Sequence, residues 1–264
     1  MAGEVERVLS REGLADGVVR VGETVRRPLG AHGPAVHGLL RYLEDVGFDG
    51  APRFLGVDEQ GREVLSYVEG DVPRGALPGY AAADDALAGV ARLLRRYHDA
   101  VQGYDPPAGA RWDAEPADLD VEPELIGHCD ITPENVVFRD GTPVALIDFD
   151  LARPTTRLYD VVTAVRHWAP LADPADRDRL LYHVDPGPRV RLFCDAYGLA
   201  RDERRWLLPA AWARFERSYR VMRERAERRG GVWAALWDGG AGRRIRRAQD
   251  WMELHWDDLD GHLV

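Results

Sequence analysis

The feature that most constrains this chain is the stretch 126–150, IGHCDITPENVVFRDGTPVALIDFD, in which two apolar runs lie among polar residues. The runs 136–138 and 144–147 are short and rich in β-branched residues, as strands are. Between them lies Asp140-Gly141, a pair typical of hairpin turns. The sequence therefore predicts a β-hairpin with polar residues at its open end.

The register of this hairpin decides which polar side chains meet. If residues 140–143 form a four-residue loop, Asn135 lies directly opposite Asp148, with Cβ atoms about 4.5–5.5 Å apart. Amide and carboxylate oxygens are hard ligands, and Mg²⁺ is commonly bound by carboxylates together with substrate phosphates. We therefore predict that Asn135 and Asp148 bind Mg²⁺. Asp130 lies on the loop that enters the same site and is available as a base.

The spacing His128-x-Asp130-x-x-x-x-Asn135, followed by Asp148-Phe149-Asp150, resembles the signature of the aminoglycoside phosphotransferase and choline kinase family. That family is related to the protein kinases, whose catalytic-loop and metal-binding motifs occur in the same order. The resemblance implies a two-lobed, kinase-like α+β fold, with Asp130 as the catalytic residue and a nucleotide as phosphate donor. The alternative is a structural hairpin with polar ends.

Residues 1–69 have the pattern of a small, strand-rich lobe, and residues 70–264 that of a larger, mainly helical lobe. In the small lobe, apolar periodicity and turn residues predict three strands, one helix and two further strands. The expected strands cover residues 5–10, 17–21, 24–28, 54–57 and 63–68, and the expected helix covers residues 35–46. This is the element order of a kinase N-lobe.

The chain has no lysine, since all 35 residues counted as Lys or Arg are arginine. The third strand of the family carries a phosphate-binding lysine, so the resemblance places Arg27 at that position and Val25 over the adenine. Strand alternation points Arg27 into the cleft and Arg26 away from it. Arginine can bind phosphate oxygens in a bidentate manner. The alternative is a surface arginine on an edge strand.

The hinge of the family reads the adenine edge through its backbone. The resemblance therefore extends the predicted nucleotide-binding residues to Ser66, Tyr67, Val68, Val137 and Ile147. Two family features do not match. Only Gly13 and Gly17 fall where a Gly-rich loop is expected, and the helix 35–46 has no clear glutamate to pair with the cation, because Glu44 lies too late. These departures are compatible with a weak or inactive kinase.

The large lobe is predicted to be helical at residues 81–100, 158–168 and 243–259. His98, near the end of the first helix, is interpreted as structural. Asp160 resembles the aspartate that supports the catalytic loop in kinase-like folds. One buried helical stripe is predicted from apolar residues that recur every three or four positions: Leu208, Trp212, Phe215, Tyr219 and Met222.

Composition limits the partners and the compartment. A formal net charge of −10 argues against general nucleic-acid binding. The two cysteines give no disulfide framework or zinc signature, and no apolar run is long enough to span a bilayer, so we expect a cytoplasmic protein without membrane partners. Residues 113–124 hold six acids and no base, which fits either a solvated loop or an acidic wall that attracts amines.

The motifs predict an enzyme that moves the γ-phosphate of a nucleotide, ATP or GTP, to a hydroxyl of a small molecule, with Mg²⁺ as cofactor. The family resemblance favours an aminoglycoside-like or other cationic, hydroxyl-rich acceptor. Two alternatives stay open. One is a kinase of peptide Ser or Thr in natural-product biosynthesis, and the other is a catalytically weak, nucleotide-binding pseudokinase or immunity-type protein.

Overall fold

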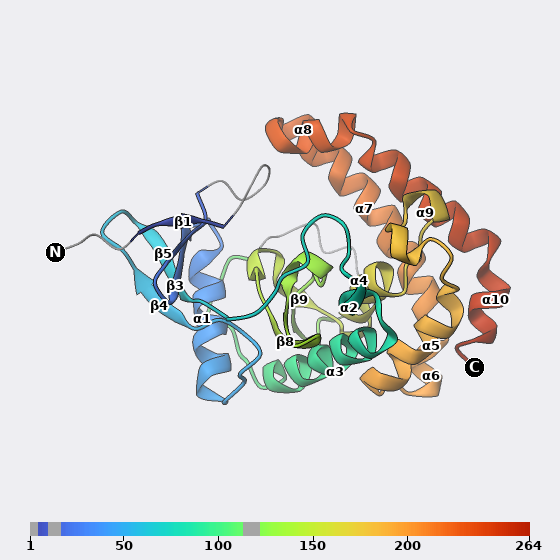
Figure 1. The fold of residues 1–264 in the computed structure, drawn as a ribbon, viewed down its shortest axis with the longest axis horizontal. Helices are drawn as coiled ribbons and strands as arrows, with labels where there is room; N and C mark the ends of the chain where they lie inside the picture. Colours follow the sequence, from blue (N-terminus) through green and yellow to red (C-terminus); the bar gives the residue numbers. More distant parts are fainter. Residues whose placement is uncertain (1–4, 10–16, 113–121) are drawn as a thin grey trace.

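The computed structural model describes residues 5–9, 17–112 and 122–264. A small antiparallel sheet with one helix forms the N-terminal part, and a larger, mainly helical part follows (Figure 1). The strands are β1 (Arg7–Val8), β2 (Val19–Val21), β3 (Thr24–Pro28), β4 (Phe54–Val57), β5 (Arg62–Ser66), β6 (Leu125–Gly127), β7 (Val136–Arg139), β8 (Thr142–Leu146) and β9 (Arg153–Thr155). The α-helices are α1 (Gly33–Asp45), α2 (Gly79–Ala82), α3 (Asp84–Val101), α4 (Arg157–Trp168), α5 (Pro186–Tyr197), α6 (Arg201–Arg204), α7 (Leu207–Arg229), α8 (Gly231–Asp238), α9 (Ala241–Leu254) and α10 (Trp256–Gly261).

The N-terminal sheet has the strand order β1-β2-β3-β5-β4, and α1 packs its buried Leu39, Leu40 and Leu43 into the core. The predicted order of three strands, a helix and two strands is confirmed. β1 covers only Arg7–Val8 of the expected 5–10, of which residue 10 lies outside the described part. β5 ends at Ser66, two residues earlier than expected, because the chain leaves the sheet there for the large lobe.

The connection to the large lobe passes directly over the hairpin. Asp71 and Phe138 exchange backbone hydrogen bonds of 2.7 and 2.8 Å. Gly70 has φ 145°, and a Cβ added there would lie 2.4 Å from the carbonyl oxygen of Phe138. Glycine is therefore required at this crossing, both for its conformation and for the close approach of the two backbones.

The hairpin forms, but the predicted register is wrong. β7 and β8 are joined by the two residues Asp140 and Gly141, both with positive φ, as in a type I′ turn. Arg139 therefore pairs with Thr142, and a register shift between Val137 and Phe138 brings Val136 opposite Leu146. The tighter turn also changes the open end, because the backbone N–H of Ile147 donates to the carbonyl oxygen of Asn135 (2.9 Å). Asn135 thus lies across from Ile147 and not from Asp148.

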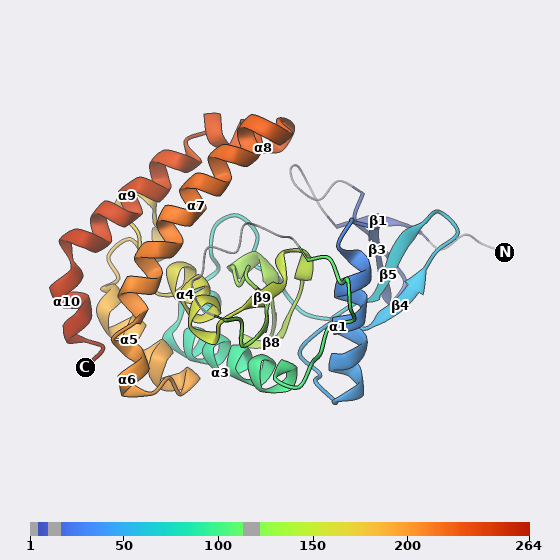
Figure 2. The same ribbon diagram turned by 180° about the vertical axis from the view of Figure 1, so that it is seen from behind.

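In the helical part, α3 packs against α5, α4 packs against α7, and α7 continues along α8 and α9 (Figures 1 and 2). The predicted stripe on α7 is only partly buried. Leu208 and Phe215 belong to the core, whereas Trp212 is 39% exposed and donates from Nε1 to Glu253 Oε1 (2.5 Å). Trp212 therefore lies at the outer edge of the contact with α9, and Ala211 takes its place in the core.

The single helix predicted for residues 243–259 is two helices, α9 and α10, which meet at His255. Of the acidic segment 113–124, residues 113–121 lie outside the described part of the chain, so the proposed acidic wall is not described. Among the residues that the structure covers, no helix is both long and apolar enough to cross a membrane.

Candidate active site

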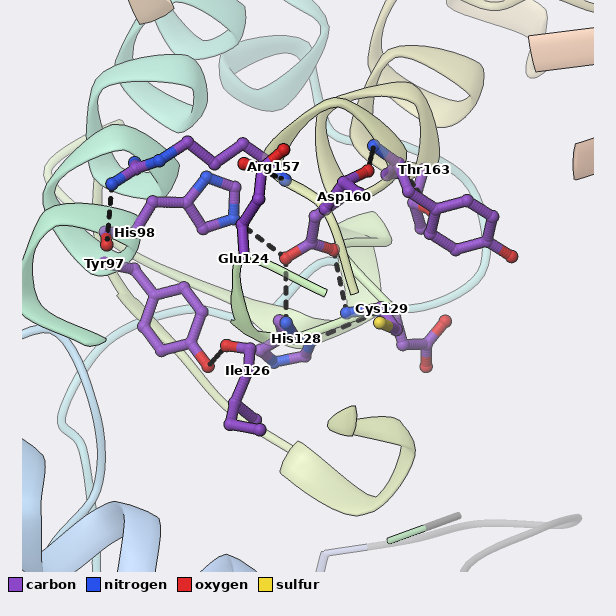
Figure 3. Close-up of polar contacts among 12 residues, drawn as sticks. Tyr97, His98, Glu124, Ile126, His128, Cys129, Arg157, Asp160 and Thr163 are labelled. Atoms are coloured by element: carbon purple, nitrogen blue, oxygen red, sulfur yellow. Dashed lines mark hydrogen bonds and ion pairs between the residues drawn. The ribbon is translucent and has the colours of Figure 1, made fainter. Parts of the chain in front are cut away.

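One buried carboxylate holds the backbone of the predicted catalytic loop, residues 128–135. Asp160, on α4, accepts hydrogen bonds from the N–H groups of His128 and Cys129, each at 2.8 Å, one through each oxygen (Figure 3). Cys129 has φ 62°, a left-handed conformation that is unfavourable for residues other than glycine and that these bonds help to hold. The carboxylate of Asp160 on α4 therefore fixes the backbone conformation of this loop. This agrees with the resemblance of Asp160 to the aspartate that supports the catalytic loop in kinase-like folds.

His98 completes this support from α3. Its Nε2 lies 3.0 Å from Asp160 Oδ2, and its Nδ1 lies 2.7 Å from the hydroxyl of Tyr197. Burial by itself raises the pKa of Asp160, but the hydrogen bond from His98 and the neighbouring histidines lower it overall. Asp160 is therefore a buried carboxylate that stays ionised because it is fully hydrogen-bonded. The structural interpretation of His98 is confirmed.

Asp130, the predicted catalytic residue, is half-buried at the end of the same loop. Asn135 Nδ2 donates both to Asp130 Oδ2 (2.7 Å) and to the backbone oxygen of Asp130 (2.9 Å). His128 donates from Nε2 to the carbonyl oxygen of Ile147 (3.0 Å), so its Nδ1 can accept the N–H of Asp130 (3.3 Å). Asp130 is thus fixed from two sides, by Asn135 and by His128.

Burial raises the pKa of the Asp130 carboxyl above its ordinary value, and the nearby His128 opposes this shift. A carboxylate with a raised pKa binds a proton more readily than an exposed aspartate does. A group of this kind, positioned by hydrogen bonds, can accept or orient a hydroxyl proton.

Arg27 connects the small lobe to the large one. On β3, its Nη1 lies 2.9 Å from Asp148 Oδ1 and its Nη2 lies 2.6 Å from Asp150 Oδ1. Although burial opposes it, the charges of Asp150, Asp148 and Glu63 raise the pKa of Arg27. Arg26 points the other way, toward Asp58 at 3.8 Å. The predicted orientation of these two arginines is confirmed.

Two residues that were not predicted complete the surroundings of Arg27. Glu63 on β5 is buried and accepts from Arg27 Nε (2.5 Å), while its other oxygen lies 2.7 Å from His37 Nε2 on α1. Burial raises the pKa of Glu63, but His37 and Arg27 together lower it below the ordinary value. The helix thus contributes a histidine where the family resemblance expects a glutamate, and the carboxylate comes from the neighbouring strand.

A sequence signal for Glu63 existed. Antiparallel pairing of the third and fifth strands places one residue directly opposite Arg27, and opposite charges are favoured in such pairs. However, α1 and β4 separate β3 from β5 in the sequence, so their register cannot be read from nearby residues. Only the structure shows that the residue opposite Arg27 is Glu63.

The residues at the open end of the hairpin fit a divalent cation. Asp148 has φ 62° and contacts Arg27, and Asp150 follows two residues later. Three carboxylates, those of Glu63, Asp148 and Asp150, contact the single guanidinium of Arg27. Asn135 uses its amide nitrogen for Asp130, so its oxygen is the atom that could bind a metal.

Among the described residues, no group of three or more His, Cys, Asp or Glu side chains is arranged to hold a metal ion. This does not conflict with a magnesium site of the kinase type. Mg²⁺ is usually bound by one or two carboxylates together with substrate phosphates and water, and seldom by a complete cage of protein ligands. Asp148 and Asn135 would supply such a partial set.

The residues predicted to contact a nucleotide lie along the sheet, the connection and the hairpin. The N–H groups of Ser66 and Tyr67 are already used, because they donate to the carbonyl oxygens of Arg53 and Glu23 (2.8 Å each). Val68 is the next residue toward the large lobe. Tyr67 lines a pocket of about 470 Å³ together with Arg7, Val8, Leu9, Arg20 and Arg74. Val25 and Ile147 are half-buried, and Val137 is buried beneath Gly70.

The comparisons with known proteins agree with this geometry. A model of the phosphotransferase enzyme family matches residues 108–194, which include the catalytic loop and the hairpin. The trifolitoxin immunity protein of Rhizobium leguminosarum bv. trifolii is 38% identical over 192 residues, which cover 71% of this chain and 72% of that protein. A homoserine kinase of Phenylobacterium zucineum is 30% identical over 177 residues, covering 53% of this chain and 54% of the kinase.

Solved structures share the fold at low sequence identity. A choline/ethanolamine kinase family protein from Mesorhizobium loti has a TM-score of 0.65 and 16% identity, with 99% of this chain and 92% of that chain covered. An amicoumacin kinase in complex with AMP-PNP, Ca²⁺ and Ami has a TM-score of 0.61 and 12% identity, with 90% and 87% covered. The predicted two-lobed, kinase-like α+β fold is confirmed, and the chain belongs to the phosphotransferase enzyme family that contains aminoglycoside phosphotransferases and choline kinase-like proteins.

Proposed function

We propose that this protein transfers the γ-phosphate of ATP or GTP to a hydroxyl of a small molecule, with Mg²⁺ as cofactor. One observation carries the proposal: Arg27 of the small lobe contacts Asp148 and Asp150 of the large lobe, next to the loop that holds Asp130. These groups are the ones that phosphoryl transfer requires, since the reaction depends on positioning and on charge stabilisation more than on covalent chemistry.

Each residue would have a separate role. Asp130 would accept or orient the proton of the acceptor hydroxyl, held in place by Asn135 and His128. Asp148 and Asn135 would hold Mg²⁺, which when bound neutralises charge on the phosphates. Arg27, positioned by Glu63, would contact the phosphate oxygens from the small lobe. The nucleotide base would lie against Val25, Val137 and Ile147, and Val68 would be the hinge residue that contacts its edge.

A direct assay tests this function. The protein is incubated with ATP or GTP, Mg²⁺ and a panel of hydroxyl compounds, and phosphorylated products are detected by mass spectrometry. We expect a phosphorylated acceptor with the wild-type protein and none with Asp130→Asn. A phosphorylated product of equal yield from both proteins would contradict the proposed site.

A second candidate function follows from the 38% identity to an immunity protein. In this alternative the protein confers immunity, either by phosphorylating a toxin, including a peptide Ser or Thr, or by binding it without turnover. Tight nucleotide binding without nucleotide turnover, whatever acceptor is added, would support the non-catalytic form. The hydrogen-bonded Asp130 and Asn135 favour the catalytic form.

A further inference from the structure

Two arginines and a histidine form a group of basic side chains where α4 and α7 pack against each other. It consists of Arg166 and His167 near the end of α4 and of Arg214 on α7. This end of α4 is adjacent to the catalytic loop, because Trp168 Nε1 donates to the carbonyl oxygen of Ile131 (2.9 Å), the residue after Asp130.

Arg214 is anchored but not neutralised. Its Nε donates to Thr163 Oγ1 on α4 (2.8 Å), a hydroxyl that in turn donates to the carbonyl oxygen of Tyr159 (2.9 Å). Its Nη1 is buried and finds no hydrogen-bond partner within the described residues. Thr163 follows Asp160 on α4, and Asp160 accepts the N–H groups of His128 and Cys129. Arg214 is therefore anchored on the helix that supports the loop of Asp130.

Arg166 is in a similar position. Its guanidinium carbon lies 5.0 Å from the centre of the Phe215 ring. Burial, and then the charge of Arg214, lower the pKa of Arg166. Burial and the charges of both arginines also lower the pKa of His167. Positive charge on Arg214 therefore opposes positive charge on Arg166, and both arginines oppose it on His167.

Several arginines elsewhere in this chain have carboxylate partners, for example Arg189 with Asp84 and Arg246 with Glu216, whereas Arg177 donates to the carbonyl oxygens of Ala172 and Val184. In the part of the chain that the structure describes, neither Arg166 nor Arg214 forms an ion pair with a carboxylate. Partly buried cations without a counter-ion are unfavourable, and a bound oxyanion would offset that cost.

From this arrangement we propose that Arg214 and Arg166 bind an oxyanion group, carboxylate or phosphate, of the acceptor whose hydroxyl faces Asp130. The inference rests on the proposed function and specifies its substrate class. The acceptor is then an anionic hydroxyl compound, unlike the cationic, hydroxyl-rich compound that the family resemblance favours. Guanidinium groups suit this role because they donate two parallel hydrogen bonds to a carboxylate or phosphate.

Binding measurements test the site without requiring turnover. Glycerol, glycerate and glycerol 3-phosphate share hydroxyl groups and differ in the anion, and gentamicin provides a cationic compound. Each is titrated by calorimetry into the protein saturated with AMP-PNP and Mg²⁺. We expect at least one anionic probe to bind about tenfold or more tightly than glycerol, as expected for hydrogen bonds to a charged group. The stronger of the two anionic probes identifies the oxyanion as carboxylate or phosphate.

Arg214→Gln and Arg166→Gln are expected to remove this preference while leaving nucleotide affinity unchanged. Arg223→Gln is the matched control, because Arg223 lies on α7 but is paired with Glu227 on an exposed face. Thermal denaturation of each variant verifies folding, and Arg166→Gln serves as the test if Arg214→Gln does not fold. The inference is overturned if no anionic probe binds better than glycerol, if gentamicin binds best, or if both Gln variants keep the wild-type preference.

Turnover distinguishes this inference from the proposed function. If an anionic probe binds through Arg214 but no compound is phosphorylated with ATP or GTP, the site is an anion site and the proposed phosphotransferase function fails. If phosphorylation occurs equally well on neutral compounds and is unaffected by Arg214→Gln, the function stands and the anionic substrate class fails.

Discussion

Arg27 and Glu63 lie directly opposite each other on β3 and β5 and form an ion pair of 2.5 Å. The pair joins neighbouring strands, so it holds Arg27 independently of how α1 is placed. Because His37 of α1 binds the other oxygen of Glu63, the helix contributes to the same arrangement through a histidine. Glu63 thus supplies, next to Arg27, the carboxylate that the helix lacks.

The first prediction concerns Asp130. Asp130→Asn should reduce turnover by about 10²–10⁴-fold, the usual contribution of a general base or orienting group, while leaving nucleotide affinity unchanged. Since burial raises the pKa of Asp130 in the folded state, ionisation of this carboxyl costs stability at neutral pH, and the variant should be as stable as the wild type or more so. Asp140→Asn, on the exposed turn, is the matched control. Retention of more than roughly half of the wild-type rate by Asp130→Asn would show that Asp130 has another role.

The same group predicts a pH dependence. The ionised form of Asp130 is required, and its pKa is raised above the ordinary 3.8. As the pH falls through this raised pKa, kcat/KM should decrease. The midpoint of this decrease, the acid limb of the pH–rate profile, should therefore lie above pH 3.8. Because the charge of Arg214 lowers the pKa of Asp130, Arg214→Gln should move this limb to higher pH. A pH–rate profile of both proteins provides the measurement, and an unchanged limb in the variant would contradict the assignment.

A third prediction concerns the metal. Asp148→Ala should abolish the dependence of nucleotide binding on Mg²⁺, and Asn135→Ala should weaken it, because these residues supply the proposed ligand oxygens. Calorimetry with ATP, with and without Mg²⁺, measures the effect. Glu134→Ala, at an exposed neighbouring position, serves as the control. If Mg²⁺ still strengthens nucleotide binding to Asp148→Ala as it does to the wild type, the metal is held elsewhere.

Arg27 and Arg26 form a matched pair for the fourth prediction. Arg27→Ala should weaken nucleotide affinity by about 1.5–3 kcal/mol, the contribution of a hydrogen bond to a charged group. Arg26→Ala should change it by about 0–1 kcal/mol, because Arg26 points toward Asp58, away from the carboxylates of the site. Titration with a fluorescent nucleotide compares the two. A larger loss in Arg26→Ala than in Arg27→Ala would contradict the orientation, and equal small losses would favour the pseudokinase alternative.

The fifth prediction concerns the buried support of the loop. Asp160→Asn places an amide where two backbone N–H groups and His98 require an acceptor, so unfolding free energy should fall by about 3–5 kcal/mol. The pKa of Asp160 is lowered in the folded state, so this contribution is present above the unfolded-state pKa and is lost as the pH falls through the folded-state value. Urea denaturation at several pH values tests this, with Asp99→Asn as an exposed control. A constant difference between Asp160→Asn and wild type down to the lowest pH would oppose the mechanism.

Local patterns in the sequence were sufficient for several features of the site. The order of Asp130, Asn135 and Asp148, the order of strands and helix along the small lobe and the inward direction of Arg27 all follow from neighbours within a few residues. Strand alternation and turn chemistry act over that range, so the sequence alone could show them. The exact hairpin register could not be derived in this way, because a two-residue turn with a register shift and a four-residue loop both fit the same residues.

Only the tertiary structure decided which distant groups meet. Arg27 contacts Glu63 across 36 positions and Asp148 across 121, and Arg214 reaches Thr163 across 51. Such pairs depend on how strands align and how helices pack, and no short-range pattern records that alignment. The sequence by itself therefore determined the family motif and the chemistry of its carboxylates. The three-dimensional packing decided that a strand glutamate positions Arg27 and that two arginines lie where α4 and α7 pack against each other, without carboxylate partners among the described residues.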